Sequence, residues 1–367
     1  MRKGLQLMTE NSSNTPPNSG LIGRPDSGLV NLDKQALPAM SEIINRSLFH
    51  IQTSKTLDGL HRIGTFELRW PDYQLVCLLA EDFCVDPDVV MSALFTVEPD
   101  TDGQWQTRLT DGRFRTLRLS NYFPKIKSFP YVKGLQLEKL FLPEGEISSI
   151  DLSIFSRMTW FWCESNRLSE LDISVAPHLT HLCCNSNQIT SLDLSVAKKL
   201  TFLSCKDNLI TNLNVTALRN ITTLSCCENS ISQLDLRNAE KLTDLWCRSN
   251  QLSKLDLSLV PNLKNLWCEK NRIKNLDLSK ANNLNALSCY SNQLPKIDLT
   301  FSPQLSLLLC SDNDIDSLDF SNTPYLKTIS CNANPLNTLD IRPINELQKL
   351  NYDVARTRLI QRPDQNF

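Results

Sequence analysis

The stretch "LWCRSNQLSKLDLS" (residues 245–258) contains a cysteine, an asparagine and an aspartate in a fixed order. The same frame occurs as "LSCCENSISQLDLR" at 224–237 and as "LWCEKNRIKNLDLS" at 266–279. The three residues could form a reactive set or belong to the scaffold. Because a catalytic site is built once and a scaffold residue recurs in every unit, the recurrence predicts a scaffold. We therefore look for function in the positions that do not recur.

The complete unit is L-x-x-L-x-C-x-x-N-x-[IL]-x-x-L-D-L-S plus four variable residues, a period of 21. It resembles the leucine-rich repeat family, in the short bacterial variety with Cys in place of a Leu of the first strand. The resemblance implies an α/β solenoid, a curved array with a parallel β-sheet on its concave face. We expect the array over residues 113–355, with about nine regular units and degenerate units at both ends, because terminal repeats must shield the core.

The recurring cysteines run from Cys163 to Cys331 at every twenty-first position. Alternation along the strand turns them inward, where a free cysteine acts as a small hydrophobe. Nine units cannot all pair as disulfides, and the column lacks the C-x-x-C spacing of a metal site. We therefore predict no metal and no cofactor. Cys183 and Cys227 fall outside this column and are expected to face solvent, which favours a reducing compartment.

An asparagine follows each cysteine of the column by three residues, where the chain leaves the strand. Its buried carboxamide can bond to backbone groups of its own and adjacent repeats, so we predict a structural ladder. The aspartates of L-D-L-S could bind calcium, but one acid per repeat favours local caps of the following turn. The ladder consists of Asn166, Asn187, Asn208, Asn229, Asn250, Asn271, Asn292, Asn313 and Asn334.

Non-recurring residues occupy the outward positions of the first strand, which line the concave sheet. Four of the six tryptophans fall there. Exposed aromatic residues beside an Arg and other charges are typical of binding hot spots. We predict a protein or peptide partner, with packing of Trp160 and Trp162 against the N-terminal domain as the alternative. The expected first patch is Trp160, Trp162, His181 and Phe202, and the central patch is Asp244, Trp246, Arg248, Trp267, Glu269 and Tyr290.

The segments outside the array have different compositions. Residues 1–40 are rich in Asn, Ser, Pro and Gly, so we expect a disordered tail or a secretion segment. Residues 41–112 are predicted to form a small α/β domain of helices and a hairpin. Over 73–120 the order of elements loosely resembles a winged helix, which implies a DNA-associated regulator. Tyr73–Pro99 contains no Lys or Arg, however, which disfavours nucleic acid. Residues 356–367 are expected to be a C-terminal tail.

The bulk composition excludes several classes of protein. There are 38 Lys and Arg against 40 Asp and Glu, so no net charge attracts nucleic acid or an anionic membrane. No apolar run is long enough for a membrane helix, and the basic start "MRKGLQLMTE" lacks an apolar h-region, so we expect no secretory signal. We expect a monomer that is cytoplasmic or delivered into a host cell, as the repeats of bacterial effectors imply. No catalytic motif is recognised; the alternative is a Cys-dependent enzyme using His181 and Cys183.

Overall fold

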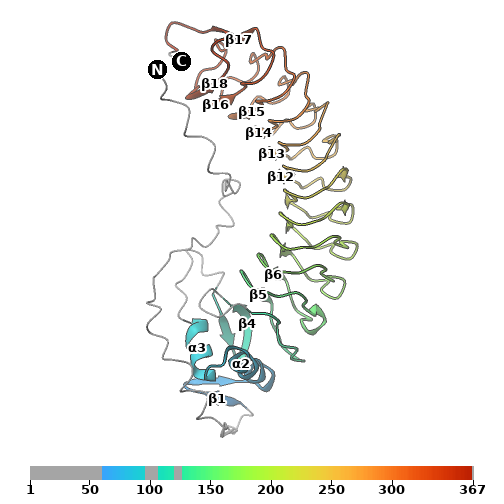
Figure 1. The fold of residues 1–367 in the computed structure, drawn as a ribbon, viewed down its shortest axis with the longest axis vertical. Helices are drawn as coiled ribbons and strands as arrows, with labels where there is room; N and C mark the ends of the chain where they lie inside the picture. The colour runs from blue at the N-terminus through green and yellow to red at the C-terminus, as the bar shows by residue number, and fades with distance from the viewer. Residues whose placement is uncertain (1–59, 96–105, 120–125, 366–367) are drawn as a thin grey trace.

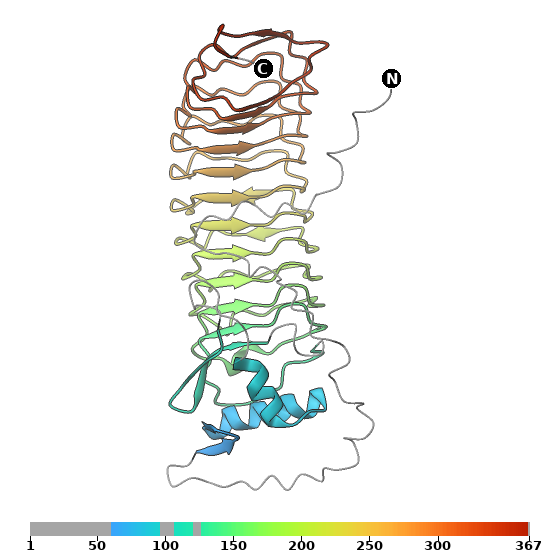
Figure 2. The same ribbon diagram turned by 90° about the vertical axis from the view of Figure 1, so that its left-hand side faces the viewer.

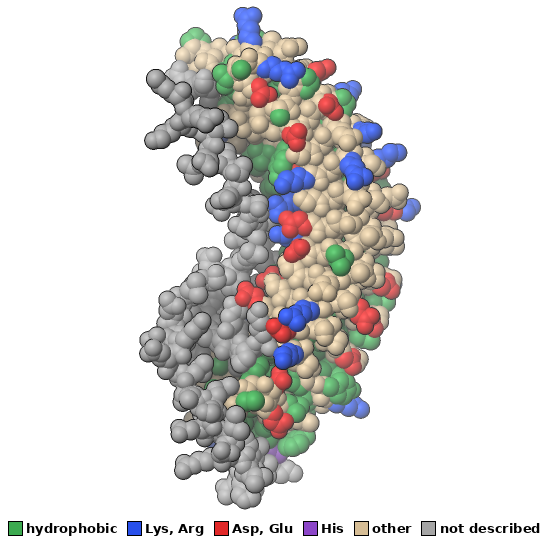
Figure 3. Space-filling view, in the orientation of Figure 1, with side chains coloured by type: hydrophobic (Ala, Val, Ile, Leu, Met, Phe, Trp, Pro, Cys, Tyr) green, Lys and Arg blue, Asp and Glu red, His purple; other side chains and the backbone are tan. Residues whose placement is uncertain are grey.

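The computed structural model describes residues 60–95, 106–119 and 126–365. It is a curved solenoid with short strands stacked along its concave side (Figures 1 and 2). On the face that Figure 3 shows, acidic and basic side chains are interspersed. The tail predicted at 1–40 lies outside the described residues. Within the described residues, no helix is long and apolar enough to cross a membrane.

One sheet of 13 strands runs through the solenoid. Successive repeats pair in parallel with equivalent positions aligned, so that Leu224, Leu245 and Leu266 are neighbours. This arrangement confirms the predicted solenoid and its parallel sheet. In chain order the strands are β3 (Arg108–Thr110), β4 (Arg113–Arg118), β5 (Lys139–Phe141), β6 (Trp160–Trp162), β7 (His181–Cys183), β8 (Phe202–Ser204), β10 (Thr223–Ser225), β12 (Asp244–Trp246), β13 (Asn265–Trp267), β14 (Ala286–Ser288), β15 (Leu307–Leu309), β16 (Thr328–Ser330) and β18 (Lys349–Asn351).

The interior is filled by the recurring apolar residues. In the repeat that begins at Leu242, each inward side chain is at most 5% exposed. Burial of one such side chain contributes about 1.5–3 kcal/mol, and it requires a neighbour on each side of the repeat. Outside the concave strands, the regular structure of the described repeats is limited to short pieces. Among them β9 (Leu213–Asn214) pairs with β11 (Leu234–Asp235), and η1 (Leu152–Ile154) is a single 3₁₀ turn. The inward side chains of this repeat are Leu242, Leu245, Cys247, Leu252, Leu255 and Leu257.

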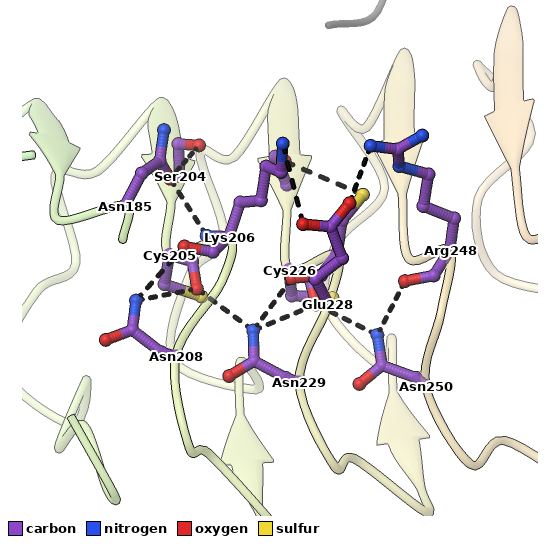
Figure 4. A network of polar contacts seen from close by, with 12 residues as sticks. Asn185, Ser204, Cys205, Lys206, Asn208, Cys226, Glu228, Asn229, Arg248 and Asn250 are labelled. Atoms are coloured by element: carbon purple, nitrogen blue, oxygen red, sulfur yellow. Dashed lines mark hydrogen bonds and ion pairs between the residues drawn. The ribbon is translucent and has the colours of Figure 1, made fainter. Parts of the chain in front are cut away.

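The asparagine ladder joins each repeat to the one before it (Figure 4). Asn250 Oδ1 accepts from the Ile231 N–H at 3.0 Å. Its Nδ2 donates to the carbonyls of Cys226 at 2.9 Å and of Cys247 at 3.1 Å, which lie in the preceding and the same repeat. Each of the nine predicted asparagines makes the same set of bonds, so the side chains link consecutive repeats along the array.

The residue before each ladder asparagine has a left-handed backbone, which the sequence did not reveal. Ser249 has φ 52° and Lys270 has φ 55°. Only Gly, Asn and Asp adopt this conformation readily, yet the chain places Asp at two of the nine positions and Ser, Glu, Lys or Ala at the other seven. The fixed turn after the strand imposes this geometry in repeat after repeat.

The aspartate column caps the turn after L-D-L-S, as predicted. Asp256 Oδ1 accepts from the Ser258 N–H at 2.9 Å, and Asp277 does the same with Ser279 at 2.9 Å. Hydrogen bonds from these serines lower the pKa of both carboxyl groups. Asn214, the one exception in the column, accepts from Thr216 N in the same way.

The N-terminal segment closes one end of the solenoid (Figure 2). It contains the hairpin β1 (His61–Ile63) and β2 (Phe66–Leu68), then α2 (Trp70–Phe83) and α3 (Pro87–Phe95). Its buried side chains belong to the same hydrophobic core as the repeats. The predicted hairpin around Asp111 and Gly112 is present as β3 and β4. These strands extend the main sheet, so the boundary predicted after residue 112 falls inside the hairpin.

The C-terminal residues also differ from the expectation. Residues 358–365 are not a tail, because β19 (Arg358–Ile360) pairs in parallel with β17 (Thr338–Asp340). Gln365 is buried. Its side-chain amide nitrogen Nε2 donates to the carbonyls of Ile341 and Ile344 at 3.0 and 2.8 Å. The open end of the core needs a cover, and this segment supplies it.

Candidate functional site

Three columns of side chains line the concave face. The parallel register aligns Asp244 with Asn265, and Trp246 with Trp267 and Ser288. A third column consists of the residues that directly follow the recurring cysteines Cys163 to Cys331, among them Arg248, Glu269 and Tyr290. Alternation along a strand turns all three columns away from the core. What distinguishes one part of this face from another is the side chain that each repeat contributes.

The first patch is a continuous stack of rings. Trp160 lies over His181 with ring centroids 3.9 Å apart, and His181 lies over Phe202 at 6.0 Å. Trp162 also stacks on Phe202 at 6.0 Å. Lys139 Nζ lies 4.2 Å from the Trp160 ring, within cation–π range. Burial, and secondarily the Lys139 charge, lowers the pKa of His181 to about 4, so this ring is neutral at pH 7.

The central patch is built around two stacked indoles. Trp246 and Trp267 have ring centroids 5.7 Å apart. Trp267 is partly exposed, but Trp246 is only 5% exposed, and so our expectation of freely exposed indoles was wrong. The physical reason is the register, because each large side chain is covered by its neighbours one repeat away. The structure therefore brings the predicted central residues together on one face, with less exposed ring surface than anticipated.

Arg248, two residues after Trp246, belongs to an ion-pair network (Figure 4). Glu228 accepts from Arg248 Nη2 at 2.7 Å, and Lys206 Nζ lies 3.6 Å from its other oxygen. We had predicted Arg248 as a contact residue, but not Lys206 or Glu228, which occupy the same edge of the sheet. Arg248 is thus already engaged by a carboxylate within the protein.

Two other carboxylates of the central patch are buried. Asp244 is 8% exposed and Glu269 is 2% exposed. Asp244 accepts from Thr243 Oγ1 and from Asn265 Nδ2, both at 2.6 Å. Glu269 Oε2 has no hydrogen-bond partner among the described residues, and burial raises the pKa of Glu269. These two acids give the patch its unusual chemistry, because a buried carboxylate is ordinarily paired with a cation.

Comparison with solved structures places the fold. The functional domain of InlJ from Listeria monocytogenes, whose structure includes a cysteine ladder, is 34% identical with a TM-score of 0.59. The match covers 60% of this chain and 49% of the InlJ chain, so it spans about half of the InlJ domain. The internalin InlF of Listeria monocytogenes, at 19% identity and a TM-score of 0.51, covers 69% of this chain and 87% of its own and shares the fold.

The chain is a leucine-rich repeat protein. No protein-family model matches it, and no curated protein matches it. The assignment depends on the 21-residue period, the parallel sheet and the similarity to these solved structures.

The thiols of this leucine-rich repeat protein are shielded from solvent. All nine cysteines of the column are buried, and Cys183 and Cys227 are also buried, at 0% and 2% exposure. Our expectation that these two face solvent was wrong. Cys183 is small and lies in register between Trp162 and Ser204, so its neighbours cover it. Burial raises the pKa of the Cys183 thiol well above its ordinary value.

The enzyme alternative therefore loses its nucleophile. An activated cysteine needs a lowered pKa and an accessible sulfur, whereas Cys183 has neither. His181 accepts or donates through Nδ1 to Thr180 Oγ1 at 2.9 Å, on its own strand. The pair carries no feature of a Cys-His catalytic centre beyond its spacing in the sequence.

We expect the native leucine-rich repeat protein to react rapidly with a thiol reagent at Cys84, its one exposed cysteine. The half-buried Cys77 should react slowly and the other 11 only after unfolding, because the thiolate is the reactive form. Absorbance after addition of an aromatic disulfide reagent measures the number of fast thiols. Cys84→Ser should abolish the fast phase, and a fast phase that persists in this variant would contradict the buried ladder.

Proposed function

We propose that this protein binds a macromolecular partner, a protein or a peptide, through the concave face of its repeats. The observation that carries the proposal is the central patch, where two indoles, an Arg and two buried carboxylates lie together. The repeats need none of them, because the positions they occupy hold varied side chains in other repeats, among them Ser, Thr, Leu and Ala. Aromatic residues and Arg dominate the energetics of protein interfaces.

We further propose a bacterial origin, since the likeness at 34% identity is to a Listeria protein. We also propose that the protein is either cytoplasmic or delivered into a host cell. The location of its partner would distinguish the two. The alternative of a DNA-associated regulator has less support. Helix α3, which would read the bases, contains no Lys or Arg and exposes Asp88, Val89 and Phe95.

The test is the affinity of a partner isolated with the wild-type protein. We expect Trp267→Ala to weaken binding at least about thirtyfold, the loss typical of a hot-spot residue. Trp267 is the better choice than Trp246, because it is partly exposed and its truncation disturbs the fold less. Titration calorimetry with the purified partner measures the dissociation constant.

Phe301→Ala is the matched control, because this aromatic residue is exposed at 43% outside the concave columns. It should change the affinity less than about twofold. Equal affinities of wild type and Trp267→Ala, with both melts unchanged, would reject the concave face as the binding surface.

A further inference from the structure

Three buried polar atoms without a hydrogen-bond partner gather in the central patch. They are Trp246 Nε1, Glu269 Oε2 and Ser288 Oγ, on three consecutive repeats. The described part of the chain contains only seven such side-chain atoms, and three of the seven lie in this one patch. Each unpaired buried group costs about 1–3 kcal/mol. Glu269 Oε2 and Ser288 Oγ can accept a hydrogen bond, whereas the Trp246 N–H needs an acceptor. A ligand that donated to the two oxygens would recover part of this free energy.

The carboxylates of the patch lack a cation. Among the described residues, neither Asp244 nor Glu269 forms an ion pair, whereas Glu228 is paired with both Arg248 and Lys206. The backbone of Glu269, the nearby Ser288 hydroxyl and the charges of Arg248 and Lys270 each lower the pKa of Glu269, by less than burial raises it. The Ser288 hydroxyl lies near the carboxylate without meeting hydrogen-bond geometry. Arg248 pairs with Glu228, and Lys270 is exposed. The Glu269 carboxylate is therefore able to pair with a positive group of a ligand.

The walls of the patch suit the same kind of ligand. An indole face attracts a cation within about 6 Å of its centroid, and Trp267 presents a partly exposed ring two residues before Glu269. Tyr290 occupies the position equivalent to Glu269 in the next repeat and is also partly exposed. Because Glu269 is only 2% exposed, a ligand reaches its carboxylate only after side chains of the patch change rotamer, and such changes are common when interfaces form.

We propose that the central patch receives a basic side chain of a protein partner, whose cationic group pairs with Glu269 and packs against Trp267. This inference rests on the proposed function and specifies the chemistry of the contact. An acidic side chain would meet the Asp244 and Glu269 carboxylates. A purely apolar side chain would leave Glu269 Oε2 and Ser288 Oγ unpaired.

The test uses acetylated and amidated hexa-arginine and hexalysine peptides, titrated into the full-length protein at about 0.15 M salt, where distant surface charges are largely screened. We expect saturable binding of at least one peptide, and the stronger of the two identifies guanidinium or ammonium as the recognised group. Glu269→Gln should weaken that binding at least about tenfold, as expected when one partner of a buried charge pair is lost. Glu240→Gln, which removes an exposed charge, should change it less than about twofold.

Trp267→Leu is a second variant that keeps an apolar side chain and removes the ring, and it should weaken binding to a similar degree. The proposal is overturned if the wild type shows no saturable binding, if Glu269→Gln binds as tightly as wild type, or if both glutamine variants lose the same affinity. A partner whose capture depends on Trp267 while the basic peptides fail to bind would leave the proposed function standing and reject only this inference.

Discussion

Asn250→Ala should lower the free energy of unfolding by about 2–4 kcal/mol. The substitution leaves the Ile231 N–H without an acceptor inside the array. It also removes one of the two asparagine amides that donate to the Cys226 carbonyl, the other being from Asn229. One orphaned buried group costs about 1–3 kcal/mol, and each lost hydrogen bond about 0.5–1.5 kcal/mol. Urea denaturation followed by circular dichroism measures the change.

The effect should spread beyond one repeat, because Asn250 bonds across the junction between two repeats and the stability of such arrays is a sum of repeat and interface contributions. Asn262→Ala is the control. Asn262 is exposed and donates a single hydrogen bond, to the Glu240 carbonyl at 2.8 Å. Its loss should cost less than about 0.5 kcal/mol. Equal unfolding midpoints for Asn250→Ala and wild type would show that the ladder does not hold the repeats together.

The periodic part of the structure could be predicted because every repeat makes the same local contacts. Cys247 is buried, Asn250 bonds to the preceding repeat and Asp256 caps the turn of its own repeat. Recurrence in the sequence then reports the position of each in the fold. The proposed binding chemistry, in contrast, depends on residues that occur once.

Burial of the non-recurring residues could not be predicted, because it is decided by neighbours 21 residues away in either direction. Trp246 and Cys183 occupy outward positions by strand alternation, and both are covered by side chains of adjacent repeats. The C-terminal strand β19 was missed for a related reason. It lacks the repeat pattern and forms because the last repeat leaves β17 unpaired on one side.

Asp72 was also missed, and it joins the N-terminal cap to the solenoid. This carboxyl group on α2 is 0% exposed, and its Oδ1 accepts from the Phe114 N–H of β4 at 2.9 Å. Oδ2 has no hydrogen-bond partner within the described part of the chain, and Arg113 Nη1 is 3.9 Å from it. Burial raises the pKa of Asp72 from 3.8 to about 6, although the Phe114 bond and the Arg113 charge oppose the shift.

Stability contributed by Asp72 should therefore be lost as the pH rises from about 4 to above 6. The folded state binds the Asp72 proton more tightly than the unfolded state, so the full contribution is present below the unfolded pKa of 3.8 and disappears above the folded pKa. At about 1.4 kcal/mol per unit of pKa, the loss is at most about 3 kcal/mol. Asp72→Asn keeps an oxygen for Phe114 and removes the titration.

The measurement is the free energy of unfolding of wild type and Asp72→Asn between pH 4 and 7.5, taken as a difference so that other titrating groups cancel. We expect the free energy of unfolding of Asp72→Asn, relative to that of wild type, to increase steadily as the pH rises. Asp256→Asn should show no such trend in this range, because hydrogen bonds from Ser258 lower the pKa of Asp256 and its contribution to stability is lost only at lower pH. Parallel curves for wild type and Asp72→Asn would mean that the junction between cap and solenoid tolerates the buried carboxylate without cost.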